Sequence, residues 1–268
     1  MPELPEVETI VRELRQKISG DIFQDVELLW TKSYQATSGL SIENQKIIGL
    51  DRKGKYIIFN LQKGFLITHL RMTGQLIIRD KLPEDVKYLR VIFRMESGRY
   101  LLFYDLRKFG RIILTGDLQN VFKNTGPDAL RDDFSTAYLY ERMRGKTLSV
   151  KSFLMDQRNV AGLGNIYIDE TLFHAKLHPQ SITGKISGKQ SEHLHAAIGI
   201  ILKSAIGRMG TTISDYKTTG GGFGENQNHL YVYGREGQAC GKCGTIIRKI
   251  KHNGRGTHFC PNCQKRVK

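Results

Sequence analysis

Apolar residues at the start of the chain recur with the spacing of one helical face. Between Pro5 and Ser19 they stand at i, i+3, i+4, i+7 and i+11, as Val7, Ile10, Val11, Leu14 and Ile18. Pro5 suits the first turn of a helix, and the carboxylates of Glu6 and Glu8 suit the positive end of its dipole. The pattern predicts a helix over residues 5–19, and helix-end electrostatics are a sufficient reason for Glu8.

From Asp21 to about Thr115 the period changes to short β-branched and aromatic runs separated by turn residues. The runs span residues 55–61, 65–72, 75–80, 89–95, 99–105 and 111–115. The segments 62–64 and 96–98 each join two runs, and each ends in glycine, which is typical of hairpin turns. The pattern predicts an antiparallel domain, either a sandwich or a flattened barrel.

The period becomes helical after a polar linker at residues 124–135. Helices are expected over residues 137–145, 150–157, 166–177 and 186–210. The glycine turn at 160–165 lies between two of them, which is a common way to present a backbone loop to DNA. The glycine-rich tract at 218–228 is expected to be a mobile loop, because its composition cannot hold one shape unaided.

The charge of the chain points to its partner. At 268 residues, 40% of them hydrophobic, the chain can bury a core and form one or two domains. Forty-one Lys and Arg against 26 Asp and Glu give a net charge of +15, which favours a polyanion such as nucleic acid. An anionic membrane surface would need a basic amphipathic helix or a lipidation signal, and neither is seen. Solubilisation by surface charge is the remaining alternative.

The sequence also bears on the compartment. No apolar run approaches the ~20 residues that span a bilayer. The acidic N-terminus lacks the apolar segment of a secretory signal. An intracellular protein without a membrane partner is therefore expected.

All four cysteines fall in two Cys-x-x-Cys knuckles. Cys240 and Cys243 form the first, Cys260 and Cys263 form the second, and 16 residues separate them. Two such knuckles on a hairpin close one tetrahedral zinc site, whereas disulfides lack a secretory context here and a redox Cys-x-x-Cys normally occurs singly. The spacing predicts one structural Zn2+. Basic residues between the knuckles, Arg255 among them, predict contacts with phosphate.

Five segments together resemble the formamidopyrimidine-DNA glycosylase family. In chain order they are MPELPEVE, HLRMTG, DLRKFG, AGLGNIYIDE and the terminal CGKC…GRGTHFCPNC, so the resemblance runs the full length of the chain. Members of this bacterial family remove 8-oxoguanine and ring-opened purines from DNA. The related endonuclease VIII usually has a glycine at the position of Leu4 and favours oxidised pyrimidines. The resemblance therefore implies the purine-lesion branch.

The resemblance implies a nucleophile at the second residue. Removal of Met1 would leave Pro2 with a free secondary amine, which can attack C1′ of the damaged nucleotide, expel the base and leave a cationic iminium. Glu3 is then expected to be the proton donor. Glu6 is expected to be a second acid that lines the same pocket.

The resemblance also implies strand cleavage and phosphate contacts. Lys55 would assist elimination of the 3′ phosphate and Arg255 elimination of the 5′ phosphate, so the protein would be a bifunctional glycosylase and AP lyase. His69 and Asn165 match further phosphate contacts of the family, and Lys146 lies where the family has a DNA-contacting lysine.

A third group matches the residues that fill the gap left by an extruded base. Met72 and Phe109 would be wedges, and Arg107 would hydrogen-bond the orphaned cytosine. Core packing is the alternative for Met72 and Phe109, but both stand in turns at the ends of predicted strands, where exposure is expected. The 218–228 tract with Phe223 resembles the segment that closes over the extruded base.

One segment departs from the family. Where the family usually shows Lys-His-Asp-His before a strand, this chain has Lys87-Tyr88-Leu89-Arg90. The DNA contact of the first histidine therefore falls at Tyr88, which cannot reproduce the imidazole contact. Arg90 is a candidate substitute for that contact.

The expected fold class is a multidomain α+β protein. An N-terminal helix and antiparallel β-sandwich would occupy residues 1–130, and a linker and helix residues 131–149. A helix-two-turn-helix domain with the lesion-capping loop would follow at 150–228, and the four-cysteine zinc ribbon hairpin at 229–268.

Three functions fit these features. The first is a DNA glycosylase and AP lyase of base excision repair that acts through Pro2 and β,δ-elimination on double-stranded DNA with a damaged purine. The second is a non-catalytic zinc-ribbon protein that binds DNA, and the third is a metal-dependent nuclease that uses Glu3, Glu6 and Glu8. A cytoplasmic monomer associated with the bacterial nucleoid is expected for the first.

Overall fold

The structure is a computed structural model that describes all 268 residues. Its contacts group the chain into two compact units. The first unit contains Met1–Lys123 and Ile206–Gln227, and the second contains Asn124–Ala205 and Asn228–Lys268.

The first unit is a β-sandwich with one long helix. Its elements are α1 (Leu4–Ile18), β1 (Ile22–Leu28), η1 (Thr31–Ser33), β2 (Tyr34–Ala36), β3 (Gln45–Lys53), β4 (Tyr56–Leu61), β5 (Phe65–His69), β6 (Gly74–Arg79), β7 (Leu89–Met95), β8 (Tyr100–Asp105), β9 (Arg111–Thr115) and α2 (Leu118–Phe122). The strands follow the order β2-β9-β5-β4-β3-β1-β7-β8-β6. All neighbours pair antiparallel except β2 and β9. Because β1 bonds to β3 only at its start and to β7 over its length, the sheet turns there into two facing halves.

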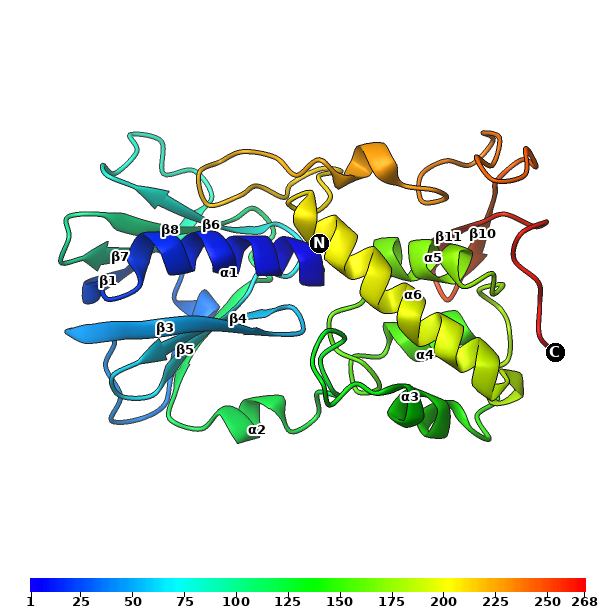
Figure 1. Ribbon diagram of the computed structural model, residues 1–268. Coiled ribbons are helices and arrows are strands. Elements are labelled where there is room, and N and C mark those ends of the chain that lie inside the picture. The colour runs from blue at the N-terminus through cyan, green and yellow to red at the C-terminus, as the bar shows by residue number, and fades with distance from the viewer. The chain divides into compact units, whose positions relative to one another are not determined.

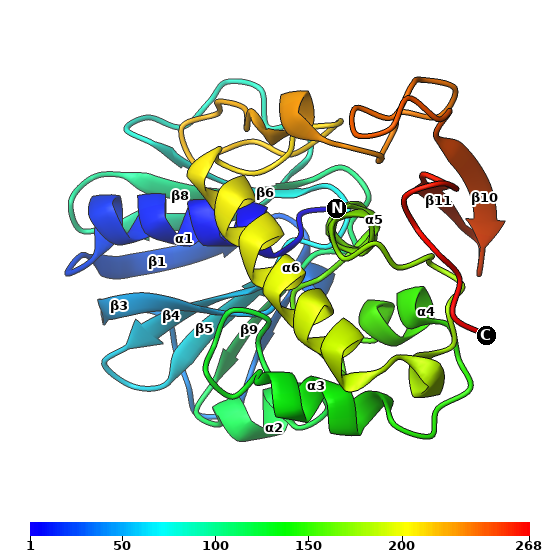
Figure 2. The same cartoon turned by 45° about the vertical axis from the view of Figure 1, so that its right-hand side comes forward.

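The helix α1 buries its apolar stripe in this sandwich. The stripe joins a core to which both halves of the sheet contribute, including Phe59 from β4 and Phe103 from β8. Figures 1 and 2 show α1 beside β1 and β3, with β6 and β8 on one side and β4 and β5 on the other. The predicted amphipathic helix and the predicted sandwich are both confirmed.

The second unit is helical and ends in a β-hairpin. Its elements are α3 (Thr136–Met143), α4 (Val150–Met155), α5 (Asn165–His174), η2 (Thr183–Lys185), most of α6 (Gly188–Gly207), part of η3 (Asn226–His229), β10 (Arg248–His252) and β11 (Arg255–Phe259). The hydroxyl oxygens of Ser135 and Ser149 cap α3 and α4 by accepting backbone N–H bonds. The glycine turn ends at Gly164, directly before α5.

The strands lie where the sequence pattern predicts them. The compact units, however, have other boundaries than the expected domains. The six apolar runs match β4 to β9, with β6 starting one residue before its run, and both predicted hairpin turns join antiparallel neighbours. The end of α6 and the residues after it, which the pattern assigned to the helical domain at 150–228, group with the first unit instead. Backbone bonds explain this, because Ile78 of β6 donates to the Thr219 carbonyl at 3.0 Å. No helix is both long and apolar enough to cross a bilayer.

The glycine-rich tract has a defined path. Besides the bond from β6, the Thr219 N–H donates to the Glu13 carboxylate of α1 at 2.7 Å, and Lys17 donates to the Thr219 hydroxyl at 3.0 Å. The composition indicated a loop without one shape, but it could not show that neighbouring side chains hold the backbone. Phe223 is 59% exposed.

Candidate functional site

The first turn of α1 holds the N-terminal residues in a buried position. Pro2 is buried, and Glu3 is 3% exposed at the extended N-cap position. The Glu6 carboxylate accepts the Glu3 N–H at 2.7 Å through Oε2 and the Thr211 N–H at 2.7 Å through Oε1. Gly210 permits this approach, because a Cβ there would lie 2.8 Å from Glu6 Oε1. Glu6 therefore fixes the backbone on which Pro2 and Glu3 stand.

A second carboxylate of α1 reaches the turn that carries Lys55. Arg52 Nε donates to Glu8 Oε2 at 2.9 Å, and Arg52 Nη1 donates to the Gly54 carbonyl at 3.0 Å. Burial raises the pKa of Glu8, but its bonds to Arg12 and Arg52 outweigh burial and lower it. Glu8 thus orients the β3–β4 turn as well as serving the helix start, and Lys55 within that turn is 5% exposed.

His69 is held as a neutral hydrogen-bond donor at the end of β5. It pairs with Tyr56 across the sheet, and its ring meets the Tyr56 ring edge-on at 4.5 Å. The Arg71 N–H donates to Nδ1 at 2.9 Å, which leaves the proton on Nε2. Burial, followed by the charges of Arg71 and Lys55, lowers the pKa of His69 to about 3. The ring is therefore neutral at physiological pH and can donate through Nε2–H.

The three expected gap-filling residues lie in exposed turns of the sandwich. Met72 is 39% exposed in the β5–β6 turn, and Phe109 is 49% exposed in the β8–β9 turn. The Arg107 guanidinium lies 4.8 Å from the Phe109 ring centroid. Core packing, the alternative that the sequence left open, does not apply to Met72 or Phe109.

Tyr88 directly precedes β7, and Arg90 is the second residue of that strand. Tyr88 is 39% exposed with φ of 68°, a left-handed conformation unusual for an aromatic residue. Arg90 Nε donates to the Asp105 carbonyl at 2.9 Å, and Nη1 donates to the Leu89 carbonyl at 3.0 Å. The Arg90 guanidinium is thus bonded to backbone oxygens of its own sheet.

A cleft of about 490 Å³ lies within the first unit. It is lined by β6 and β8 residues such as Gln75 and Tyr104 and by the 215–221 segment, including Lys217 and Gly221. Gln75 Nε2 donates to the Asp215 carbonyl at 2.7 Å, so the segment is tied to the sheet beside the cleft. The volume of the cleft lies within the roughly 300–1,000 Å³ range of ligand pockets.

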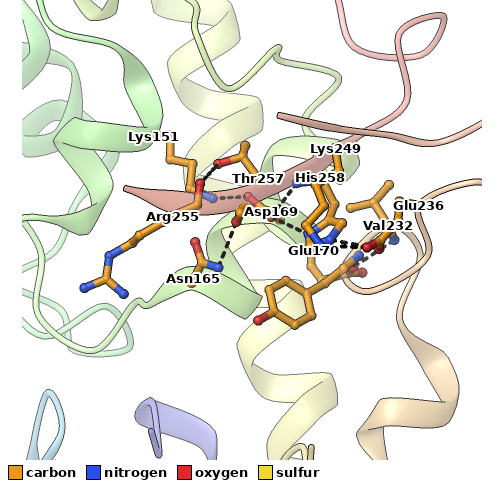
Figure 3. Close-up of polar contacts among 12 residues, drawn as sticks. Lys151, Asn165, Asp169, Glu170, Val232, Glu236, Lys249, Arg255, Thr257 and His258 are labelled. Atoms are coloured by element: carbon orange, nitrogen blue, oxygen red, sulfur yellow. Dashed lines mark hydrogen bonds and ion pairs between the residues drawn. The ribbon is translucent and has the colours of Figure 1, made fainter. Parts of the chain in front are cut away.

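In the second unit, α5 organises the hairpin that carries Arg255 (Figure 3). Asn165 Nδ2, at the first turn of α5, donates to the Gly256 carbonyl of β11 at 3.0 Å. Asp169 accepts the His258 N–H at 2.8 Å, and its other oxygen accepts Lys151 Nζ at 2.6 Å. The Arg255 side chain extends away from these contacts in Figure 3.

Glu170 holds the segment that leads to the hairpin. Its carboxylate accepts the backbone N–H groups of Tyr231, Val232 and Tyr233 at 2.8 to 2.9 Å. Burial raises the pKa of Glu170, while the three N–H bonds work in the opposite direction. Asp169, Glu170 and Lys151 were not found from the sequence. The available signal was two adjacent acids inside the otherwise apolar stretch at 166–173.

The tip of the hairpin is fixed by a tight turn. Asn253 and Gly254 have φ of 46° and 77°, which suits a two-residue type I′ turn, and Arg255 pairs with His252 across it. His252 Nε2 lies 2.8 Å from Ser149 Oγ and 3.0 Å from Ser152 Oγ at the start of α4. Lys146 is half-buried in the same unit, before that helix.

The four cysteines converge as predicted. Their sulfur atoms all lie within 4.8 Å of one another. The Cys240–Cys263 and Cys243–Cys260 sulfurs are 3.9 and 3.5 Å apart, near the ~3.8 Å edge of a tetrahedron with Zn–S bonds of about 2.3 Å. The residues fit one Zn2+ with four thiolate ligands and no open position, so the metal is structural and supplies folding energy to the hairpin.

The expected site residues therefore form two sets. Pro2, Glu3, Glu6, Lys55, His69, Met72, Tyr88, Arg107 and Phe109 belong to the first unit. Lys146, Asn165, Arg255 and the four cysteines belong to the second.

Comparison with known proteins identifies the same family that the sequence motifs resemble, with matches along the length of the chain. Three family models match, namely the Formamidopyrimidine-DNA glycosylase N-terminal domain over residues 1–112, the Formamidopyrimidine-DNA glycosylase H2TH domain over residues 125–217, and the zinc finger found in FPG and IleRS over residues 237–266. The chain is 40% identical to the formamidopyrimidine-DNA glycosylase of Prochlorococcus marinus, over 99% of this chain and 100% of that protein. It is 41% identical to the enzyme of the same name from Desulforamulus reducens, over 99% of each.

Solved structures agree. A mutant of the Lactococcus lactis FPG in complex with a Fapy-dG containing DNA superimposes with a TM-score of 0.90 at 37% identity, over 99% of this chain and 100% of that one. MutM in complex with carbocyclic 8-oxo-G containing DNA gives a TM-score of 0.88 at 36% identity, also over 99% and 100%.

Proposed function

Because this chain belongs to the formamidopyrimidine-DNA glycosylase family, we propose that it excises oxidised purines from double-stranded DNA and then cleaves the strand through a covalent intermediate at Pro2. Relatives bound to DNA with Fapy-dG and with carbocyclic 8-oxo-G support damaged purines as the substrate. The enzyme is in this proposal both a formamidopyrimidine-DNA glycosylase and an AP lyase.

The observation that carries the proposal is the burial of the N-terminal turn. Chain ends are normally exposed and poorly ordered, yet Pro2 and Glu3 are buried, and Glu6 holds the Glu3 N–H. Once Met1 is removed, a secondary amine would stand next to a buried carboxylate on a fixed backbone. Covalent amine catalysis needs a nucleophile and a proton donor in such a preorganised arrangement.

In the proposed reaction, the Pro2 nitrogen bonds to C1′ while the bond from C1′ to the base breaks. Glu3 supplies a proton to the departing base or to O4′, and opening of the sugar ring leaves an iminium between Pro2 and C1′. The cationic iminium acidifies C2′, so loss of a C2′ proton expels the 3′ phosphate. A second elimination then expels the 5′ phosphate.

The remaining site residues suit the DNA backbone and the gap in the duplex. The charges of Lys55 and Arg255 and the neutral Nε2–H of His69 can bind phosphate oxygens. Asn165 and Lys146 contact the DNA backbone in this proposal. Tyr88 takes the place of the family's usual histidine at a further DNA contact. We also infer a monomer that works in the cytoplasm on nucleoid DNA.

Borohydride trapping tests the proposal. Wild-type protein and a duplex with 8-oxoguanine opposite cytosine should give a covalent adduct whose DNA maps to the N-terminal peptide. Pro2→Gly should give less of this adduct, because the imine of a primary amine must first be protonated, whereas the iminium of proline is always cationic. Pro5→Gly makes the same exchange one helical turn later and should keep the adduct.

Three outcomes would reject the Pro2 assignment. They are no adduct with the wild type, an adduct of unchanged yield at a lysine in Pro2→Gly, and equal loss in both variants. Specific DNA binding with no adduct would support a non-catalytic zinc-ribbon protein. Turnover that chelation abolishes and Mg2+ restores would support a metal-dependent nuclease.

A further inference from the structure

The two turns that carry the gap-filling residues share an unusual backbone feature. In each turn, the residue directly before the apolar wedge is left-handed without being glycine. These are Arg71 before Met72, with φ of 55°, and Lys108 before Phe109, with φ of 59°. Such a conformation costs roughly 1–3 kcal/mol and persists only where the surroundings fix it.

One buried carboxylate fixes both turns. Asp105 ends β8 and is 1% exposed. Its Oδ1 accepts the Thr73 hydroxyl of the first turn at 2.5 Å and the Arg107 N–H of the second turn at 3.2 Å. Its Oδ2 accepts the Gly110 N–H at 2.7 Å, at the far end of the second turn. The same side chain therefore joins the Met72 turn to both ends of the Arg107–Phe109 turn.

The backbone of Asp105 is held as firmly as its side chain. Its N–H donates to the Tyr88 carbonyl at 2.8 Å, and its carbonyl accepts Arg90 Nε at 2.9 Å. Both partners lie in the segment where this chain departs from the family's usual sequence. The sequence suggested Arg90 as a substitute DNA contact, but its side chain instead supports the backbone of Asp105.

Packing further limits the second turn. A Cβ on Gly110 would lie 2.4 Å from the Phe103 ring, so β8 and the turn are in close contact. Lys108 Nζ lies 4.0 Å from the ring centroid of Trp30, which holds the strained residue from outside. The second turn is thereby restrained on both sides of Phe109.

We propose that Asp105 and Thr73 are positioning residues that lock the two turns into one preformed wedge, with Arg90 as its backbone brace. Met72, Arg107 and Phe109 then enter the duplex as a unit instead of ordering separately after the base leaves. Ordering before binding lowers the entropy cost of filling the gap. The inference rests on the proposed function, because it assumes that these three residues fill the gap.

The test uses Thr73→Val, which removes one hydroxyl, keeps the side-chain shape and leaves the Asp105 carboxylate in place. Two activities are compared in each variant, excision of 8-oxoguanine opposite cytosine in a duplex and cleavage of a single-stranded abasic oligonucleotide, which needs no gap filling. The Thr73 hydroxyl donates to the carboxylate and also accepts the Arg107 N–H at 3.1 Å. Loss of these two bonds predicts at least about a 10-fold slower duplex excision, with abasic cleavage within about 2-fold of the wild type. The preference for cytosine over adenine opposite the lesion should fall as well, because Arg107 loses its fixed position.

Two further variants make the test specific. Thr73→Ser keeps the hydroxyl and should restore duplex excision. Thr115→Val removes another buried threonine hydroxyl, one that accepts the Asp117 N–H at 3.1 Å at the opposite end of β9, and it should leave both activities unchanged.

Equal loss of both activities in Thr73→Val, or unchanged duplex excision, would overturn the proposed lock. Failure of the proposed function appears differently, since wild-type protein would then cleave neither substrate.

Discussion

At the scale of single residues, the N-terminal turn depends on the Glu6 carboxylate. Each of its oxygens accepts one backbone N–H, from Glu3 and from Thr211. Glu6→Gln would turn an amide NH2 toward one of these donors, and an unpaired buried donor costs about 1–3 kcal/mol. We expect the free energy of unfolding, measured by urea denaturation, to fall by that amount and the borohydride adduct at Pro2 to weaken.

The exposed Glu43 provides the control for this exchange. Glu43→Gln should change the free energy of unfolding by less than about 0.5 kcal/mol, since Glu43 is on the surface of the same unit. Equal stability of the Glu6→Gln and Glu43→Gln proteins would contradict a structural role for Glu6.

His69 should make stability depend on pH below neutrality. Its folded pKa of about 3 lies below the ordinary value of 6.5, so between these values the unfolded chain binds the extra proton. The contribution of neutral His69 is therefore fully present above about pH 6.5 and declines as the pH falls toward 3. Relative to His69→Gln, the wild type should lose on the order of 3 kcal/mol between pH 7 and pH 4.

Denaturant titrations at several pH values measure this difference. His193→Gln, which changes an exposed histidine of the second unit, should run parallel to the wild type. A difference between wild type and His69→Gln that stays constant with pH would show that His69 titrates alike in the folded and unfolded chains.

The sequence predicted which residues carry the chemistry of the site better than it predicted their hydrogen-bond partners. Pro2, Glu3 and the cysteines stand in motifs whose chemistry is local. Glu8 was explained by helix-end electrostatics alone, because its partner Arg52 lies 44 residues away and no spacing rule links them. Asp169 and Glu170 were missed for the same reason, since backbone groups 61 to 89 residues distant satisfy them.

At the scale of elements, periodicity was informative because most elements are amphipathic. It anticipated α1 and the strands β4 to β9. The strands β1 to β3 lay inside the strand-rich region but were not singled out, since β1 and β3 mix apolar with charged residues and β2 has only three residues. Composition could not indicate the contacts of the 218–228 tract, where the Thr219 backbone bonds to Glu13 and to β6.

Zinc should hold the hairpin that carries Arg255. Beyond the β10–β11 ladder, the hairpin has a small apolar cluster in which Cys240 and Cys260 are themselves members, together with Phe173. Chelation should release one Zn2+ per chain and expose amides of residues 238–268 to hydrogen exchange, while the amides of α1 stay protected and act as the internal reference. Affinity for duplex DNA should fall at least 10-fold, and added Mg2+ should not restore it. Unchanged protection of the hairpin after zinc release would contradict a structural metal.

At the scale of the whole molecule, each compact unit is built from two separate stretches of the chain, whereas the sequence analysis divided the chain into four consecutive segments. Those segments follow the order of the motifs along the chain, but Ile206–Gln227 belongs to the unit that contains the N-terminus. This grouping depends on Glu6 and Glu13 of α1 as acceptors for Thr211 and Thr219. Long-range hydrogen bonds of this kind leave no periodic signal in a sequence.

The net charge of +15 predicts how DNA affinity responds to salt. Each phosphate neutralised by Lys or Arg adds about 0.9 to the slope of log affinity against log salt. The Arg255 side chain extends from the hairpin tip, whereas Arg94 is paired at 2.8 Å with Asp25 and bonded to Glu27. Arg255→Ala should therefore lower affinity for duplex DNA and reduce the slope by about 1, while Arg94→Ala, which removes a neutralised charge, should leave the slope unchanged. Fluorescence anisotropy from 50 to 300 mM salt measures both slopes, and equal slopes for the two variants would show that Arg255 does not contact phosphate.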